Sequence, residues 1–138
     1  MSARYLLDKS ALARMIHPSV RRRLAPIIEA GEAASCAVVD LEVLYSARTY
    51  EDYVETRRRR DLAYHQVPLT EDAFRRAIDV QQELAGSGHH RLPIPDLIIA
   101  AAAERASLTV LHYDNDFDTI AGVTGQPVEW VVDRGSVP

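Results

Sequence analysis

Short apolar runs alternate with amphipathic segments along the whole chain. Short runs bounded by polar residues predict buried strands, whereas apolar positions that recur every three or four residues predict helices. We expect strands at residues 4–7, 35–39, 65–69, 108–112 and 128–132, and helices at 11–16, 18–28, 41–47, 50–64, 71–84, 97–106 and 117–121. This alternation predicts an α/β protein with a parallel sheet that has helices on both faces.

Polar residues at the predicted helix starts refine these boundaries. Ser10 is suited to cap the helix at 11–16, and Asp40 is suited to cap the helix at 41–47. With Asp40 at the cap, Glu42 would lie in the first turn of its helix. These assignments place polar side chains directly after the first two predicted strands.

Two of the predicted helices differ in where their apolar residues lie. Residues 71–84 follow a capping Thr70 and are amphipathic. Their apolar face is expected to carry Phe74, Ala77, Ile78 and Leu84. Residues 97–106 are apolar nearly all round, which is typical of a helix buried in a core. Asp96, at the start of that helix, would therefore be carried towards the centre of the sheet.

Length and composition indicate one ordinary domain. The chain has 138 residues, of which 47% are hydrophobic, so we expect residues 1–138 to form a single domain around one core. No run approaches the ~20 consecutive apolar residues of a membrane span, and the first residues lack the layout of a signal peptide. We therefore expect a cytoplasmic protein. The single cysteine, Cys36, has apolar neighbours, which indicates a buried, inert thiol.

Acidic residues fall just beyond the predicted strands. Asp8 follows the first strand, Glu42 lies beyond the second, and Asp114 and Asp116 follow the strand at 108–112. In parallel sheets the carboxyl ends of the strands form the ligand-binding edge, so these acids and Asp96 should converge there. Converging carboxylates repel one another, and a hard divalent cation such as Mg²⁺ or Mn²⁺ would relieve that repulsion. Such a site is suited to hydrolysis of phosphodiester bonds.

Taken singly, each of these acids has a structural interpretation. Asp8 could be a turn residue at the end of a strand, Asp96 a helix cap, and Asp114 part of a turn. When the acids are considered together, the structural interpretation is weaker, above all for Asp96 at the start of a buried helix. The positive end of that helix dipole should also favour the ionised form of Asp96 at neutral pH.

Four motifs give the chain a resemblance to a known family. They are residues 5–11 (YLLDKSA), 42–45 (EVLY), 94–101 (IPDLIIAA) and 110–120 (VLHYDNDFDTI). In this order and spacing they resemble PIN-domain proteins, most closely the VapC-type toxins of toxin–antitoxin pairs. The resemblance implies a three-layer α/β/α sandwich with a mostly parallel sheet and an acidic Mg²⁺ or Mn²⁺ site. It also implies endonucleolytic cleavage of RNA, with tRNA or rRNA as the expected substrate, homodimerisation, and inhibition by a cognate VapB-like antitoxin.

The resemblance also assigns roles to individual acids. Asp8, Glu42, Asp96 and Asp114 match the catalytic acidic quartet of the family. For the metal we expect Asp8, Asp96 and Asp114 as ligands, with Asp116 as an additional acid. The resemblance therefore places catalysis and metal binding in one cluster of carboxylates.

The chain departs from the family pattern at two positions. Lys9 stands where the family usually has Thr, so Ser10 is the residue left to supply an accessory hydroxyl beside the metal. Val39 stands three residues before Glu42, where a hydroxyl residue is common. Neither departure removes an acid, so we expect changed metal affinity or substrate preference with the chemistry retained.

The distribution of charge bears on how RNA could bind. The formal net charge of −4 argues mildly against a protein that coats nucleic acid by electrostatics alone. Arginines nevertheless cluster, and such a run is either a solvated helix face or a phosphate contact. Because an acidic site repels RNA unless basic groups flank it, our candidates for RNA contacts are Arg57, Arg58, Arg59, Arg60 and Arg91.

Other functions fit the sequence less well. A haloacid-dehalogenase-like phosphatase needs a second Asp two residues after the first, where this chain has Ser10. A response-regulator receiver places its acids at different strand ends. A catalytically silent binding module with the same fold is a further alternative, against which the complete acidic quartet argues.

Overall fold

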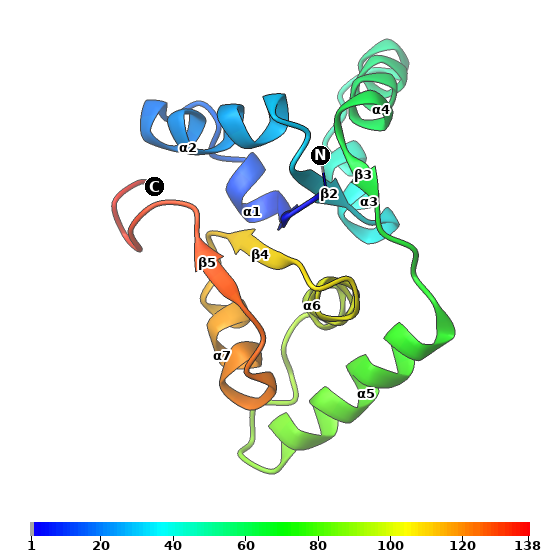
Figure 1. The fold of residues 1–138 in the computed structure, drawn as a ribbon, viewed down its shortest axis with the longest axis vertical. Coiled ribbons are helices and arrows are strands. Elements are labelled where there is room, and N and C mark those ends of the chain that lie inside the picture. The colour runs from blue at the N-terminus through cyan, green and yellow to red at the C-terminus, as the bar shows by residue number, and fades with distance from the viewer. Residues whose placement is uncertain (1) are drawn as a thin grey trace.

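The computed structural model describes residues 2–138 (Figure 1). The strands are β1 (Tyr5–Leu7), β2 (Ala33–Ser35), β3 (His65–Gln66), β4 (Thr109–His112) and β5 (Val128–Trp130). The helices are α1 (Lys9–Leu12), α2 (Pro18–Glu29), α3 (Ala37–Tyr45), α4 (Tyr50–Ala63), α5 (Glu71–Ala85), α6 (Ile94–Arg105) and α7 (Asn115–Thr124). Strands and helices alternate much as the sequence pattern predicts.

The strands form one sheet in the order β3-β2-β1-β4-β5, and every neighbouring pair is parallel. In the register, Leu6 of β1 lies opposite Ala34 of β2 on one side and Val110 of β4 on the other. The chain therefore adds β2 and β3 on one side of β1, and then adds β4 and β5 on the other side. This order reverses between β1 and β4, and ligands of parallel α/β sheets bind beyond the strand ends at such a point.

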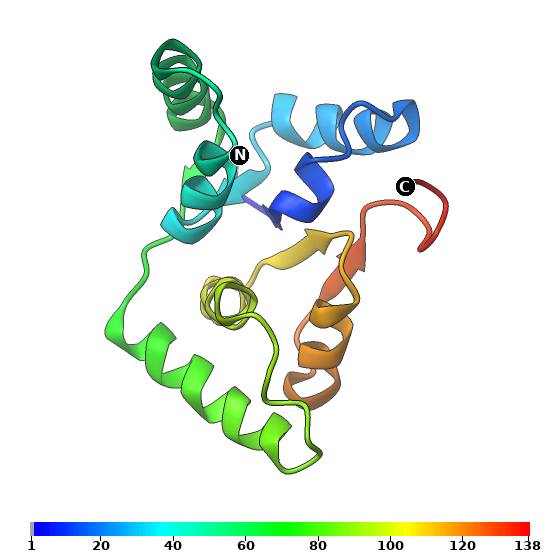
Figure 2. The ribbon, with the colours of Figure 1, turned by 180° about the vertical axis from the view of Figure 1, so that it is seen from behind.

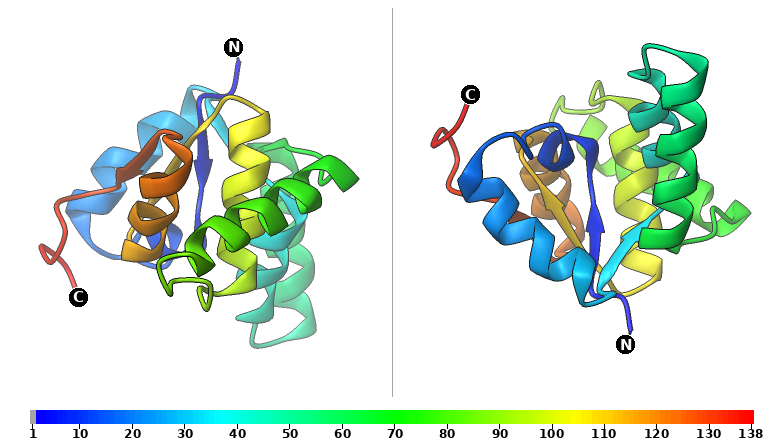
Figure 3. Two further views of the ribbon diagram at one scale, coloured as in Figure 1. Left: turned by 90° about the horizontal axis from the view of Figure 1, so that it is seen from below. Right: turned by 90° about the horizontal axis from the view of Figure 1, so that it is seen from above.

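Helices cover both faces of the sheet. Alternate strand residues point to opposite faces, and because these residues are apolar, both faces must be buried. Leu6 and Val110 pack into a core shared with α3, α5, α6 and α7. Leu7 and Leu111 pack on the opposite face with α1 and α2. The layers are seen from behind in Figure 2 and from below and above in Figure 3. The predicted three-layer α/β/α sandwich is confirmed.

The second strand and the helix after it begin earlier than predicted. β2 ends at Ser35, and the residues expected to complete the strand, Val38 and Val39, belong to α3. Val39 fills the core from that helix, so packing outweighs the strand preference of a β-branched pair. Asp40 does not cap this helix as predicted, because the helix starts earlier and Cys36 is at the cap position. Glu42 consequently lies in the second turn of α3 and not in the first.

The helix starts around the acidic residues also differ from prediction. The cap of α1 is Asp8 and not Ser10, because the Asp8 carboxylate itself accepts the Ser10 backbone N–H. In the same way Asp114 caps α7 by accepting the backbone N–H of Asp116. α6 begins at Ile94, so Asp96 lies in its first turn. Two of the predicted site acids therefore start helices directly after β1 and β4.

The buried face of α5 is rotated from the predicted one. Ala77 and Leu84 are buried as expected, but Phe74 and Ile78 are 39% and 52% exposed. The core instead receives Ala73 and Val80 from this helix. Phe74 and Ile78 lie one turn apart and leave a short apolar strip on the surface.

Two further expectations concern the cysteine and membrane spans. Cys36 is fully buried, and burial raises the pKa of its thiol, as expected for an inert side chain. Within residues 2–138, none of the helices combines the length and apolar composition that crossing a bilayer requires.

Candidate functional site

The predicted acidic quartet lines one cavity. A hollow of 280 Å³ is lined by Asp8, Glu42, Asp96 and Asp114, together with Lys9 and Ser10. Asp8 and Asp114 follow β1 and β4, the strands between which the order of the sheet reverses. Glu42 comes from α3 and Asp96 from the first turn of α6. Four separate elements thus bring these carboxylates together at the edge where ligands of such sheets bind.

Asp116 joins this cluster from the first turn of α7. One carboxylate oxygen from each of Asp96, Asp114 and Asp116 lies within 4.8 Å of the others. The Asp116 backbone N–H donates to Asp114 Oδ1 at 2.9 Å, which fixes the Asp114 carboxylate at the start of the helix. Asp8 and Glu42 line the cavity but lie outside this tighter group of three acids.

The Asp8 carboxylate is oriented by Ser10. Asp8 Oδ2 accepts the Ser10 backbone N–H at 2.9 Å and the Ser10 hydroxyl at 2.6 Å. Ser10 Oγ in turn accepts the Tyr113 backbone N–H at 2.8 Å. The Ser10 hydroxyl is therefore engaged with Asp8 and with the strand end at β4, and it acts on the site through Asp8.

Two buried oxygens in the cavity have no hydrogen-bond partner among residues 2–138. They are Asp8 Oδ1 and Asp96 Oδ2. A buried carboxylate oxygen that makes no hydrogen bond carries a desolvation cost that a bound cation would remove. Oxygen donors at this density suit hard divalent cations such as Mg²⁺ and Mn²⁺. The residues present therefore fit a divalent metal.

Burial and mutual repulsion raise several pKa values in the cluster. Burial, followed by the charges of Asp8 and Asp114, raises the pKa of Asp96 from 3.8 to about 8. Burial is also the main cause of the raised pKa values of Asp8 and Glu42. The expectation that the helix dipole keeps Asp96 ionised is therefore wrong for the metal-free protein. A bound divalent cation would favour the ionised form and reverse this effect.

His112 positions Asp114 from beneath the site. Its Nδ1 accepts the Asp114 backbone N–H at 3.1 Å, so the ring proton is on Nε2. The imidazole is fully buried between the rings of Phe117 and Trp130, and burial lowers its pKa. A neutral, packed imidazole at the end of β4 thus holds the turn that presents Asp114.

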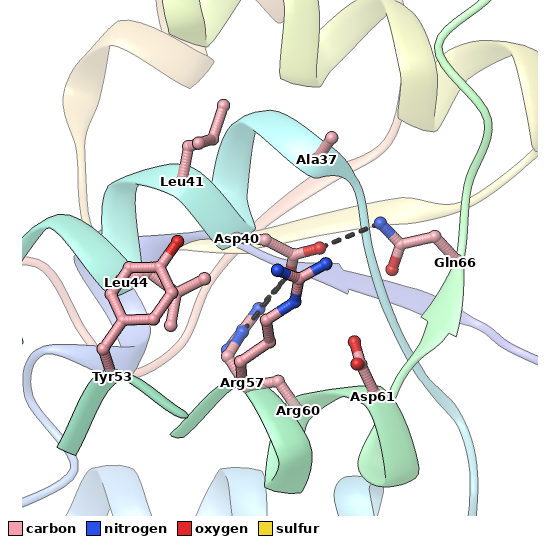
Figure 4. A pocket seen from close by; sticks show the side chains of 9 residues that line it. All are labelled: Ala37, Asp40, Leu41, Leu44, Tyr53, Arg57, Arg60, Asp61 and Gln66. Carbon is pink, nitrogen blue, oxygen red and sulfur yellow. Dashed lines mark hydrogen bonds and ion pairs between the residues drawn. The ribbon is translucent and has the colours of Figure 1, made fainter. Parts of the chain in front are cut away.

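A larger cavity, lined by none of the quartet, lies between α3 and α4. It has a volume of 460 Å³ and an apolar wall of Leu41, Leu44 and Tyr53 (Figure 4). It is lined by two acids, Asp40 and Asp61. Asp40 is paired, because Arg60 donates to Asp40 Oδ1 at 3.0 Å and Gln66 donates to Oδ2 at 2.9 Å. A carboxylate already satisfied in this way does not make a metal site.

The predicted RNA-contact arginines differ in their surroundings. Arg60 is buried, with its guanidinium bonded to Asp40 and to the Ser35 hydroxyl, so it is not free to contact a phosphate. The other four candidates are exposed. Arg58 and Arg59 both face Glu55 on the same helix. Sequence spacing could not separate Arg60 from its neighbours, because its partners lie on other elements.

Comparison with known proteins relates this site to a family. The PIN domain family matches residues 5–123. The chain is 50% identical to ribonuclease VapC21 of Mycobacterium tuberculosis over 99% of both chains. Its fold matches the DNA-bound VapBC of Salmonella typhimurium (TM-score 0.77, 18% identity, 94% and 99% of the two chains covered). It also matches VapBC-5 of Mycobacterium tuberculosis (TM-score 0.57, 27% identity, 94% and 96% covered). The chain therefore belongs to the PIN-domain family, as a VapC-type member.

Proposed function

We propose that this chain is an endoribonuclease toxin that cuts RNA at a divalent metal held by its acidic cavity. The observation that carries the proposal is the convergence of four carboxylates in one cavity. Two of them, Asp8 and Asp96, each have a buried oxygen without a hydrogen-bond partner among residues 2–138. The ribonuclease VapC21, half of whose residues are identical over nearly the full length, supports the activity. We further propose that residues 1–138 act as one PIN domain in the cytoplasm, as a homodimer.

The acids divide into ligands and a proton acceptor in this proposal. Asp96, Asp114 and Asp116 would hold the metal, and Asp8, oriented by Ser10, would complete the site. When bound, Mg²⁺ or Mn²⁺ supplies charge stabilisation at phosphorus and lowers the pKa of a bound water. Glu42, which is half-buried and lines the cavity, would accept a proton from an attacking water.

The activity is tested by incubating the purified protein with total cellular RNA and Mg²⁺ or Mn²⁺, and then mapping new 5′ ends. We expect a discrete cut in one tRNA or rRNA that disappears when the metal is chelated. Cleavage that persists at full rate with chelator would contradict a metal-dependent site. Absence of any cut in RNA with either metal would contradict the ribonuclease itself.

We propose that the exposed arginines Arg57 and Arg91 contribute phosphate contacts. Reversing the charge of Arg57 and Arg91 together should weaken RNA binding and flatten its dependence on salt, by roughly 0.7 in the log–log slope for each lost phosphate contact. The matched control reverses Arg22 and Arg75, which are exposed on α2 and α5. If both double variants bind RNA alike, the Arg57 and Arg91 side chains are solvated and make no phosphate contact.

An antitoxin partner is the remaining part of the proposal. The cavity lined by Leu41, Leu44 and Tyr53 offers apolar surface for a peptide segment, and Leu41 lies next to Glu42 of the acidic cavity. Without metal the quartet forms a negatively charged cavity that would attract a basic side chain. One arginine guanidinium can bind two carboxylates through its planar set of donors. We propose that a VapB-like antitoxin places an Arg or Lys there and competes with the metal.

This competition predicts how inhibition responds to metal and to mutation. Inhibition of RNA cleavage should weaken as the Mg²⁺ concentration rises. Replacing the inserted basic residue of the antitoxin by Ala should reduce inhibition more than binding, since the apolar segment supplies most of the contact area. Both quantities are measured on the purified complex, by cleavage rate and by calorimetry. Full inhibition that depends on neither change would mean that the antitoxin blocks the RNA path without entering the site.

A further inference from the structure

A second hollow adjoins the acidic cavity. It has a volume of 330 Å³ and is lined by Lys9, Leu41, Glu42 and Tyr45. Lys9 and Glu42 also line the acidic cavity, so the two hollows share a wall. We call the second one the side hollow. Anything that occupies it lies directly beside the carboxylates of the proposed metal site.

Lys9 is the basic residue of the side hollow. It is the sole lysine of the chain and, among residues 2–138, the only basic side chain that lines either of the two hollows. Its Nζ donates to Ser46 Oγ at 2.9 Å, which holds the ammonium between α1 and the end of α3. A fixed ammonium beside a cluster of carboxylates is placed to attract a phosphate that would otherwise be repelled.

Tyr45 and Leu41 give the same hollow an apolar surface. The two residues are one turn apart on α3, and their side chains are 87% and 65% exposed. An exposed aromatic ring next to a basic side chain is the combination on which single-stranded nucleic acids bind, with a base on the ring and a phosphate at the charge. The side hollow therefore combines both elements with a shared wall to the acidic site.

We propose that the side hollow is a subsite for one unpaired nucleotide of the RNA, next to the phosphodiester that is cut. The base would stack on Tyr45 and pack against Leu41, and its phosphate would contact Lys9. The nucleotide must be unpaired, because a base inside a double helix is stacked on both faces and cannot lie on a protein ring. This inference rests on the proposed function and adds the three side chains, of Lys9, Leu41 and Tyr45, that would contact that nucleotide.

A protein segment is the alternative occupant of the same surface. Leu41 also lines the cavity between α3 and α4, so an antitoxin segment could extend across it. The hollow carries one ammonium, of Lys9, and one carboxylate, of Glu42 on the wall shared with the acidic cavity. We favour RNA because the ammonium can bind a phosphate and the exposed Tyr45 ring beside it can stack on a base, whereas an inserted arginine or lysine would meet the Lys9 charge. The test must therefore measure RNA and antitoxin binding on the same variants.

The binding experiment uses the Asp96→Asn protein, which should neither cleave RNA nor bind the metal, and fluorescein-labelled decauridylate without added divalent metal. Tyr45→Ala on this background should weaken binding about tenfold, whereas Tyr45→Phe should retain it, because a phenyl ring stacks as well. The control is Tyr50→Ala, which removes a tyrosine that is 78% exposed on α4 and lines neither hollow. When the decauridylate is annealed to decaadenylate, the proteins with Tyr45 and with Ala at this position should bind it with the same affinity.

The Lys9 contact is tested by salt dependence. Lys9→Met keeps most of the side-chain length and removes the charge, so the slope of log affinity against log salt should fall by roughly 0.7. Arg22→Met, which removes an exposed charge of α2, should leave the slope unchanged. Equal slopes for wild-type Lys9 and Lys9→Met would overturn the phosphate contact.

The outcomes separate the subsite from the proposed function. The subsite is wrong if decauridylate does not bind, or if Tyr45→Ala binds it as tightly as Tyr50→Ala does. It is also wrong if Tyr45→Ala weakens binding of the antitoxin but not of decauridylate. If the wild type cuts no RNA while Tyr45-dependent binding persists, the proposed function fails and the subsite stands. If the wild type cuts RNA and Tyr45→Ala cuts it with unchanged KM, the subsite fails and the proposed function stands.

Discussion

Asp96→Asn should lower RNA cleavage by about a thousandfold or more and leave the fold intact. The substitution keeps the size of the side chain and removes the charge that draws the metal, and metal stabilisation of the transition state is worth several kcal/mol. The control is Asp72→Asn, the same change in the first turn of α5, where the side chain is exposed. Cleavage rates of the two variants with Mn²⁺ make the comparison. An active Asp96→Asn protein would remove Asp96 from the site.

The same variant should change how stability depends on pH. In the metal-free protein the pKa of Asp96 is about 8 when folded, against 3.8 for an ordinary Asp, so the native state holds an extra proton between these values. Stability should therefore fall as pH rises from about 4 to 8, by up to about 1.4 kcal/mol per pH unit. Asp96→Asn lacks this contribution, and urea unfolding at several pH values should show a flatter profile. Parallel profiles would mean that Asp96 is not protonated in the native state.

Arg60→Met should lower the free energy of unfolding by about 3 kcal/mol, because it leaves the Asp40 carboxylate without its cation in a largely buried site. Arg60 is 9% exposed and joins α4 to Asp40 of α3 and to Ser35 of β2. Thermal unfolding should shift downward by roughly 10 °C.

Two further variants define what this loss means. Arg59→Met, the exposed neighbour, should change the free energy of unfolding by less than about 0.5 kcal/mol. Replacing both partners, as Asp40→Leu with Arg60→Met, should recover much of the loss, because no unpaired charge remains. If Arg60→Met and Arg59→Met unfold alike, the Arg60–Asp40 pair does not hold α4 in place.

The position of the acids could be predicted from the sequence because it follows from topology. Once strands and helices alternate, Asp8 and Asp114 must follow strands, and a helix as apolar as α6 must carry Asp96 into the core. The convergence of the quartet needs no side-chain detail. The boundary at residues 35–39 could not be predicted, since a short apolar run suits a strand or a helix equally until packing selects one.

The pairing of side chains was beyond the sequence. Arg60 looks like Arg57, Arg58 and Arg59 in the sequence, and only the packing of α4 against α3 and β2 gives it the partners Asp40 and Ser35. Similarly, the sequence offers Ser10 as a hydroxyl near the metal, but the geometry commits that hydroxyl to Asp8. Contacts between residues far apart in the chain decide these roles, and no local pattern encodes them.

Calorimetric titration of the metal-free protein with Mn²⁺ at pH 7 tests the central claim most directly. Asp96, with a pKa of about 8, must lose its proton to bind the metal, so binding should release close to one proton, measured by comparing buffers of different ionisation enthalpy. The wild type and Asp72→Asn should show the same saturable binding and proton release, and Asp96→Asn should show neither. Equal Mn²⁺ binding by wild type and Asp96→Asn would contradict a metal site in the acidic cavity.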